Sequence, residues 1–142
     1  VVQYLTKRNE WMVSNCYQYG FILRYPDDKA EQTGIAYMPH HFRYVGAVHA
    51  AIMNENQYCL EEYLTALKSY SESAPLTYTL SGTAYSIYYV PMDASGTTTL
   101  SIPKETPNYT ISGNNMDGFI VTIAATAAGT SEQTNATDSA AP

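Results

Sequence analysis

Residues 37–46 read YMPHHFRYVG, an aromatic stretch that carries two adjacent histidines. Aromatic and β-branched side chains favour an extended backbone, so residues 41–45 are predicted to form a strand. Neighbouring residues of a strand point to opposite faces of their sheet, so His40 and His41 cannot easily bind one metal ion together. At most one of the two histidines is therefore expected to be a metal ligand.

The sequence on either side of this stretch indicates helices and short strands. Residues 3–19 have apolar side chains at helical spacing and precede Gly20, a residue type that commonly ends a helix. Extended runs are predicted at 21–25 and 33–38. Two further helices follow, indicated by Val48, Ala51, Ile52, Leu60, Tyr63, Leu64 and Leu67. Residues 1–70 are thus predicted to form helices and a partial antiparallel sheet.

The composition of the chain changes beyond residue 70. The Ser- and Pro-containing stretch 71–76 is predicted to be a linker. Residues 77–124 contain short runs rich in Tyr, Thr and Ile, spaced about ten residues apart, which is typical of a small all-β, sandwich-like domain. Residues 125–142 are small and polar without periodicity, and are predicted to be a disordered tail. The predicted fold class is therefore α+β.

Composition and charge exclude several classes of protein. The net charge of −6 leaves no basic surface for nucleic acid. No segment approaches the roughly 20 apolar residues of a membrane span. Cys16 and Cys59 are the only cysteines, and either a single disulfide or two buried free thiols would suit them. The sequence around Asn114 and Asp117 lacks the spacing of a calcium loop and is predicted to be a hairpin turn.

Three blocks of the sequence are similar to one known family in both order and spacing. They are YGFILRYP (19–26), TGIAYMPHHFRYVG (33–46) and CLEEYL (59–64). Together they resemble the C-terminal half of VanY-type D-alanyl-D-alanine carboxypeptidases, zinc peptidases of the M15 class. The resemblance covers roughly residues 3–70 and implies half of an M15 peptidase core. The β-rich region also resembles an appendage that some of these proteins carry.

The resemblance implies a function and a location. Members of the family trim peptidoglycan stem peptides that end in D-Ala-D-Ala, so such a peptide is the expected partner. The protein is then expected to be extracellular or associated with the cell wall, in a Gram-positive bacterium.

Carried over residue by residue, the resemblance also assigns site positions. The family block reads Glu-Pro-Trp-His, with a general-base glutamate and a zinc-ligating histidine. His41 takes the zinc-ligand position, His40 replaces the tryptophan, and Met38 occupies the general-base position. The other two family ligands come from a block of the form Ser-x-His-x-x-Gly-x-Ala-x-Asp, and the sequence contains no such block.

These departures predict a fragment or degenerate form of a zinc carboxypeptidase. A catalytic zinc takes about three protein ligands, and methionine is not a base near neutral pH. The isolated chain is therefore expected to be inactive and to bind no zinc, with no catalytic residue assigned. A non-catalytic cell-wall binding or interaction module is the alternative. A third hypothesis makes the β-rich region an adhesion or spacer module.

Three other residues and one surface complete the expectations. Arg24 and Arg43 would either orient a substrate carboxylate or pair with nearby acids, of which Asp27, Asp28 and Glu31 are the candidates. His49 is expected on a helix surface. A partial sheet would expose an edge and some of its hydrophobic face, which predicts self-association.

Overall fold

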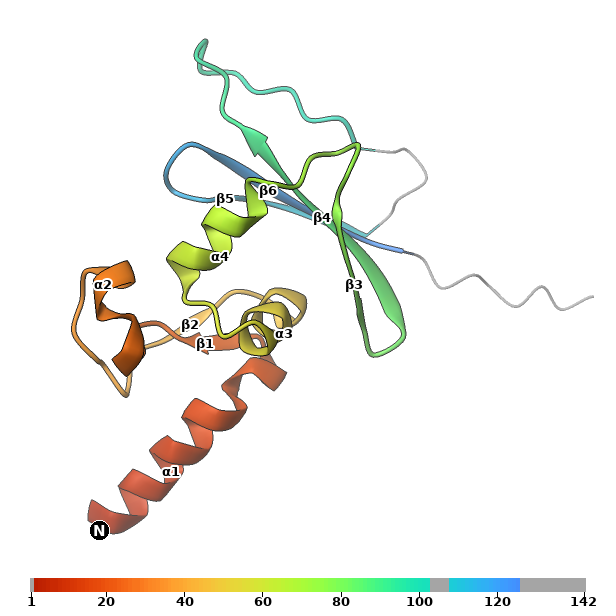
Figure 1. Ribbon diagram of the computed structural model, residues 1–142. Helices are drawn as coiled ribbons and strands as arrows, with labels where there is room; N and C mark the ends of the chain where they lie inside the picture. Colours follow the sequence, from red (N-terminus) through yellow and green to blue (C-terminus); the bar gives the residue numbers. More distant parts are fainter. Residues whose placement is uncertain (1, 103–107, 126–142) are drawn as a thin grey trace, which may run out of the picture.

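A long helix leads into a small helical region that packs against a four-stranded sheet (Figure 1). The computed structural model describes residues 2–102 and 108–125. Helix α1 (Val2–Asn15) continues as the 3₁₀ turn η1 (Cys16–Tyr19), as the pattern over 3–19 predicts. Gly20 ends it at a φ of 81°, where a Cβ atom would lie 2.7 Å from the Tyr44 ring. Both constraints favour glycine at this position.

Two short strands follow and pair antiparallel with each other. They are β1 (Phe21–Leu23) and β2 (Phe42–Tyr44), with Phe21 opposite Tyr44. The extended run predicted over 21–25 thus forms a strand only at 21–23, and Ile22 is the buried residue of β1.

The strand expected at 33–38 does not form. The 3₁₀ turn η2 (Asp27–Lys29) and helix α2 (Ala30–Thr33) are followed by a loop, and Gly34 at a φ of 69° turns the chain. An extended run is stable as a strand only where another strand completes its ladder, and none of the described residues pairs with this run. Met38 instead donates one backbone hydrogen bond to Tyr25 at 3.1 Å.

Helices α3 (Ala47–Glu55) and α4 (Leu60–Leu67) form where the apolar spacing predicts them. The start of α4 carries a capping box, in which the Cys59 backbone N–H donates to the Glu62 carboxylate at 2.9 Å. Glu61 and Glu62 lie in the first turn of α4, where the helix dipole favours acidic side chains. Both cysteines, Cys16 and Cys59, are buried free thiols in the structure, so the disulfide alternative is not realised.

The β-rich region forms a single antiparallel sheet in the order β3-β4-β6-β5. The strands are β3 (Leu76–Leu80), β4 (Thr83–Pro91), β5 (Tyr109–Gly113) and β6 (Gly118–Ala124). This corrects the expected sandwich for 77–124, because the described strands make one layer instead of two. Helices α3 and α4 contact β3 and β4, so they take the place of a second sheet. The α+β fold class is confirmed.

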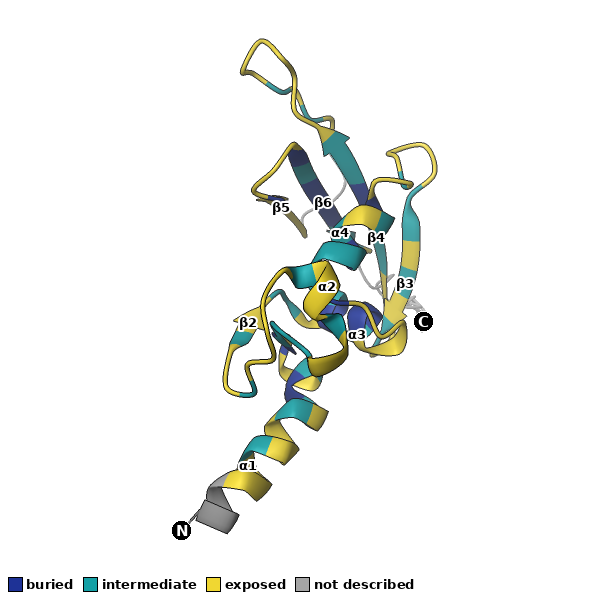
Figure 2. Ribbon diagram, turned by 60° about the vertical axis from the view of Figure 1, so that its left-hand side comes forward, coloured by how far each residue is buried: buried dark blue, intermediate teal, exposed yellow. Residues whose placement is uncertain are grey.

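The hydrophobic core runs without a break from the helices into the sheet. Met53 and Leu67 from the helices and Ile87 from β4 are almost completely inaccessible to solvent. The buried cluster consists of Ile22, Val48, Ala50, Ile52, Met53, Tyr63, Leu67, Ile87 and Ile120. Buried residues accordingly gather where α3 and α4 meet the sheet, whereas much of α1 is exposed (Figure 2).

The stretch predicted to be a linker makes backbone contacts of its own and lies next to the larger sheet. Within the predicted linker 71–76, Ser71 and Ala74 form an isolated bridge, and Tyr70 accepts a hydrogen bond from Tyr89 in β4. The boundaries of the units at 1–70 and 77–124 stay predictions. Nearly all of the predicted tail, 126–142, lies outside the described residues. No described helix has the length and apolar character needed to cross a membrane.

Candidate functional site

The turn that carries the two histidines lines an open hollow of about 500 Å³. His41 donates a backbone hydrogen bond to Met38 at 3.3 Å, so these residues stand at the two ends of one turn. Met38 is 44% exposed. The residues assigned to the zinc-ligand and general-base positions therefore both line this one hollow.

The two histidines make different contacts. The His41 ring packs edge-on against the Tyr25 ring, with 5.0 Å between centroids. The backbone carbonyl of His41 accepts a hydrogen bond from the Arg24 backbone N–H at 2.8 Å. The His40 Nδ1 atom lies 2.8 Å from Asn9 Oδ1 on α1. Both histidines line the hollow, and one ring nitrogen of His40 is engaged with α1.

The hollow does not assemble a zinc site from the described residues. Nowhere in 2–102 or 108–125 do three or more His, Cys, Asp or Glu side chains gather closely enough to hold a metal ion. Beside His41 stands the thioether of Met38, which is a weak ligand for zinc. A catalytic zinc takes about three N, O or S ligands, so this part of the chain does not fit the metal by itself.

A second, larger cleft of about 540 Å³ lies beside β2. Its walls come from Arg24, from β2, α3 and α4, and from the hairpin between β5 and β6. Arg24 and Glu61 form a two-pronged ion pair in one wall, with Arg24 Nη1 donating to Glu61 at 3.1 Å. Burial would raise the pKa of Glu61, but the hydrogen bonds and charge of Arg24, together with a backbone hydrogen bond and the Cys59 side chain, lower that pKa below its ordinary value.

The two arginines considered from the sequence differ in their contacts. Arg24 pairs with Glu61 instead of with Asp27, Asp28 or Glu31. Arg43 lines the same cleft, and no described residue forms a hydrogen bond or an ion pair with its side chain. The cleft consequently presents one cationic side chain that the described part of the chain does not neutralise.

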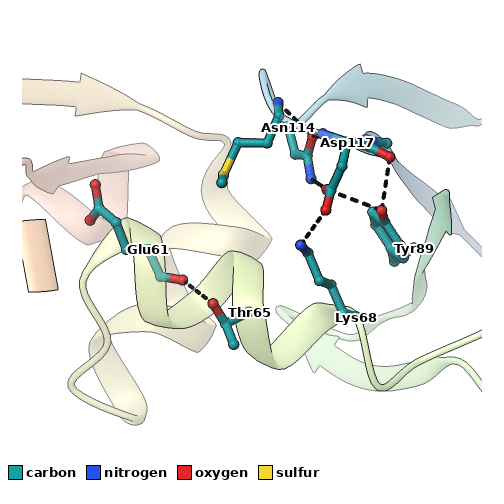
Figure 3. A network of polar contacts seen from close by, with 8 residues as sticks. Glu61, Thr65, Lys68, Tyr89, Asn114 and Asp117 are labelled. Carbon is teal, nitrogen blue, oxygen red and sulfur yellow. Dashed lines mark hydrogen bonds and ion pairs between the residues drawn. The ribbon is translucent and has the colours of Figure 1, made fainter. Parts of the chain in front are cut away.

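The hairpin wall of the cleft is held by a polar network (Figure 3). The Asn114 side chain accepts backbone hydrogen bonds from Met116, Asp117 and Gly118, each at 3.0 Å. Asp117 in turn accepts from Lys68 at 2.5 Å and from Asn114 at 2.8 Å. These bonds lower the pKa of Asp117 to about 2. The hairpin turn predicted here is confirmed, and Lys68 ties it to the end of α4.

His49 also lines the cleft, and it corrects the expectation of a helix-surface histidine. Its two ring nitrogens lie 2.8 Å from the Tyr63 hydroxyl and 2.9 Å from the Thr122 hydroxyl. Burial lowers the pKa of His49 to about 4. The neutral ring therefore joins α3, α4 and β6 by hydrogen bonds.

The cleft could hardly be predicted from the sequence. Its residues come from segments as distant as 24, 61 and 114, and no local motif joins them. The one available signal was an acidic residue, Glu61, in a helix's first turn, with an arginine on a nearby predicted strand. That signal indicates a pairing but does not identify which arginine takes part.

Comparison with known proteins gives several partial matches. A family model described as VanY: D-alanyl-D-alanine carboxypeptidase matches residues 2–47. A D-alanyl-D-alanine carboxypeptidase of Enterococcus faecium is 47% identical over 114 residues, which is 80% of this chain and 36% of that protein. The bifunctional D-Ala-D-Ala dipeptidase and carboxypeptidase VanXYC of Enterococcus gallinarum is 60% identical over 45 residues, covering 32% of this chain and 24% of that one.

A solved structure matches the fold as well. The vancomycin resistance D,D-dipeptidase VanXYg, crystallised with a D-Ala-D-Ala phosphinate analogue, superimposes with a TM-score of 0.74 and 44% identity. The match covers 80% of this chain and 45% of that one. The chain therefore spans less than half the length of the relatives it matches. The resemblance to VanY-type carboxypeptidases is confirmed, and the partial coverage fits a match to one half of such a protein.

Proposed function

We propose that this chain is part of a zinc D-Ala-D-Ala carboxypeptidase and is catalytically inactive on its own. The hollow that holds Met38 and His41 at the ends of one turn carries the proposal. It sets the zinc-ligand position beside a side chain that cannot act as a base. Support for the reaction class comes from the VanY match, which spans residues 2–47 and so includes both residues.

The chemistry explains why the Met38 position matters. Hydrolysis of a peptide bond needs a group that takes a proton from the attacking water, and a carboxylate does this in many hydrolases. A thioether has no basicity in this range. Loss of a general base alone typically lowers the rate by about 10²- to 10⁴-fold. The proposed substrate is a peptidoglycan stem peptide ending in D-Ala-D-Ala, met outside the cell or at the wall of a Gram-positive bacterium.

Zinc binding by the purified 142-residue chain tests the metal part of this proposal. We expect no stoichiometric zinc by elemental analysis, and the same result for His41→Ala. A single tightly bound zinc that disappears in His41→Ala would contradict the proposal, because it would require ligands that the described residues do not gather.

Release of D-alanine from a synthetic stem pentapeptide tests the activity part. We expect no release above background, with the E. faecium relative as the positive control. Met38→Glu supplies a carboxylate at the general-base position, and we expect it to stay inactive because the metal ligands are still incomplete. Turnover by the unmodified chain would refute the proposed inactivity.

A non-catalytic cell-wall binding module is the second candidate, and the unneutralised Arg43 favours it. A guanidinium in a cleft of about 540 Å³ can hold a carboxylate with two parallel hydrogen bonds. Co-sedimentation with purified peptidoglycan tests this candidate, with Arg43→Met as the variant and the exposed Arg8→Met as its matched control. Loss of retention in Arg43→Met alone would favour binding, whereas equal retention in all three proteins would refute it.

A further inference from the structure

Met38, Pro39, His40 and His41 form one tight turn before β2. The His41 N–H donates to the Met38 carbonyl at 3.3 Å, which is the bond between the first and last residues of a β-turn. Proline at the second position favours such a turn, because its ring fixes φ. The Cα atoms of Met38 and His41 therefore lie within about 7 Å of each other. The side chains of Met38, His40 and His41 thus start from one small loop.

The turn also removes the geometric objection to a shared ligand role for the two histidines. Side chains alternate between opposite faces in an extended strand, and β2 begins only at Phe42. His40 lies inside the turn and His41 at its end, and both line the hollow with Met38. The expectation that at most one of the two is a ligand assumed an extended backbone at both residues, which the structure does not have.

The contact between His40 and α1 orients the His40 ring. Its Nδ1 atom lies 2.8 Å from Asn9 Oδ1, an amide oxygen that accepts a hydrogen bond. In the neutral ring Nδ1 then carries the proton, and the opposite nitrogen, Nε2, keeps a free lone pair. Histidine ligands of metal ions commonly donate their second ring N–H to an oxygen in this way, which fixes both the tautomer and the ring orientation.

The donor set of the hollow suits a soft, monovalent metal ion better than zinc. Thioether sulfur selects monovalent copper, and imidazole nitrogen also suits copper. A divalent ion would keep more uncompensated charge among neutral donors than a monovalent one. The residues that line the hollow, none of them acidic, are Tyr37, Met38, Pro39, His40, His41 and Phe42. The thioether that argues against zinc hydrolysis thus favours a different ion.

Several other soft donors of the chain are not available to an ion from solvent. The thiols of Cys16 and Cys59 are buried, with exposed fractions of 4% and 1%. The chain has three histidines, and His49 has one ring nitrogen 2.8 Å and the other 2.9 Å from a hydroxyl oxygen. His40 and His41 are therefore the histidines that an ion can reach.

We propose that Met38, His40 and His41 form a binding site for monovalent copper, with one thioether and two imidazole ligands. The turn brings the ligands together, the bond to Asn9 orients one ring, and the open hollow of about 500 Å³ admits the ion. This site goes beyond the proposed function, since neither zinc binding nor hydrolysis enters it. A chain that binds copper but no zinc satisfies both proposals, and absence of copper binding would count against this one alone.

Competition with bicinchoninate, a chromophoric chelator of monovalent copper, measures binding by the 142-residue chain. The titration is done without oxygen and with ascorbate, which keeps the copper monovalent. We expect one copper per chain, and an affinity lowered by about tenfold or more in His40→Gln, His41→Gln and Met38→Leu. Met92→Leu is the matched control, because Met92 is 56% exposed and should not contribute. Circular dichroism confirms that each variant is folded.

A second measurement locates the ion without any substitution in the titrated chain. The methionine methyl groups are isotope-labelled, and their NMR resonances are followed as monovalent copper, a diamagnetic ion, is added. We expect the Met38 resonance to shift until one equivalent is present. The resonances of Met53, Met92 and Met116 should stay in place. The spectrum of Met38→Leu, which lacks one resonance, assigns the signal.

Other outcomes overturn the proposal. Failure of the chain to take copper from the chelator refutes the site. Copper that remains bound with unchanged affinity in the double variant His40→Gln, His41→Gln assigns it to the thiols of Cys16 and Cys59 instead. Binding without a shift of the Met38 resonance, together with unchanged affinity in Met38→Leu, excludes the thioether as a ligand. Equal losses in Met38→Leu and Met92→Leu would show that copper is held by exposed methionines in general.

Discussion

The two sheets of this molecule differ in how their strands are supported. In the larger sheet, β4 and β6 each pair with neighbours on both sides, and Ile87 and Val121 are completely buried. In the smaller sheet, β1 and β2 are three residues long and pair on one side only. The larger sheet is thus closed by its own chain, whereas the smaller one is incomplete within the described residues.

The sheet that contributes most to the core is therefore not the one next to the candidate site. The well-packed sheet carries much of the core but not the turn of Met38 and His41. That turn directly precedes β2, whose residues are mostly exposed. The residues assigned to the carboxypeptidase site therefore lie in the least supported part of the structure, where a partner strand would have the largest influence on their order.

Shortening a buried side chain should destabilise the larger sheet more than the smaller one, and this is the largest effect that we expect. Ile87→Ala removes a fully buried side chain from β4 and should lower the free energy of unfolding by about 4 kcal/mol. Ile22→Ala in β1 should cost about 2 kcal/mol, because its surroundings lie near the surface and can close around the gap. Urea denaturation of both variants measures this. Equal losses would show that the small sheet is as tightly packed as the large one.

Acidification should weaken the junction between helices and sheet through His49. Its pKa falls from 6.5 in the unfolded chain to about 4 in the folded one. The unfolded chain thus binds the extra proton between these values, so stability falls as the pH drops from 6.5 to 4. The full loss is about 3 kcal/mol. Urea unfolding at several pH values measures it.

His49→Gln is the matched control for this pH dependence, because it keeps a polar side chain that does not titrate. The lowered pKa values of Glu61 and Glu62 affect stability only as the pH falls below about their ordinary value of 4.5. A slope between pH 4.5 and 6.5 that persists in His49→Gln would therefore exclude His49 as its source.

Removal of the hairpin anchor should have a somewhat smaller effect. Asn114→Ala leaves three backbone N–H groups without their acceptor and should cost about 2 kcal/mol. Asn114→Asp retains an acceptor oxygen and should cost less. Thermal unfolding followed by circular dichroism compares them. Equal destabilisation by both changes would indicate that the amide's own bond to Asp117 matters more than the three that it accepts.

The smallest effect is expected in the site turn. Met38→Glu changes an exposed side chain on a loop and should alter the free energy of unfolding by less than about 0.5 kcal/mol. Chemical denaturation of this variant beside the unmodified chain measures the change. A large loss would mean that Met38 packs against something, and it would complicate the use of this variant in the activity assay.

The sequence predicted the helices and turns correctly, because these elements depend mainly on residues close together in the chain. The helices with apolar spacing formed, Gly20 ended the first of them, and the turn around Asn114 joined two strands. The run 33–38 has the composition of a strand but lacks a partner among the described residues, and composition alone cannot supply one. Similarly, the expected sandwich assumed a second sheet, while the apolar faces of α3 and α4 cover the first.

In the candidate site, too, the part that is continuous in sequence could be predicted and the part formed by tertiary packing could not. The turn of Met38 and His41 is continuous in sequence, so comparison with a family block could find it. The cleft depends on which acid meets Arg24 and on where the hairpin lies relative to α4, and both follow from tertiary packing. His49 was misplaced for the same reason, since its partner Thr122 is distant in the chain.

The strand order of the larger sheet has a consequence for synthesis on the ribosome. β6 lies between β4 and β5, yet it is the last described strand to be made. Ile120, which belongs to the buried cluster, and Val121, which is also buried, therefore leave the ribosome after every other described element. The helices and β4 must wait with apolar surface exposed until residue 124 emerges. Premature termination before β6 should accordingly yield a chain that aggregates instead of folding.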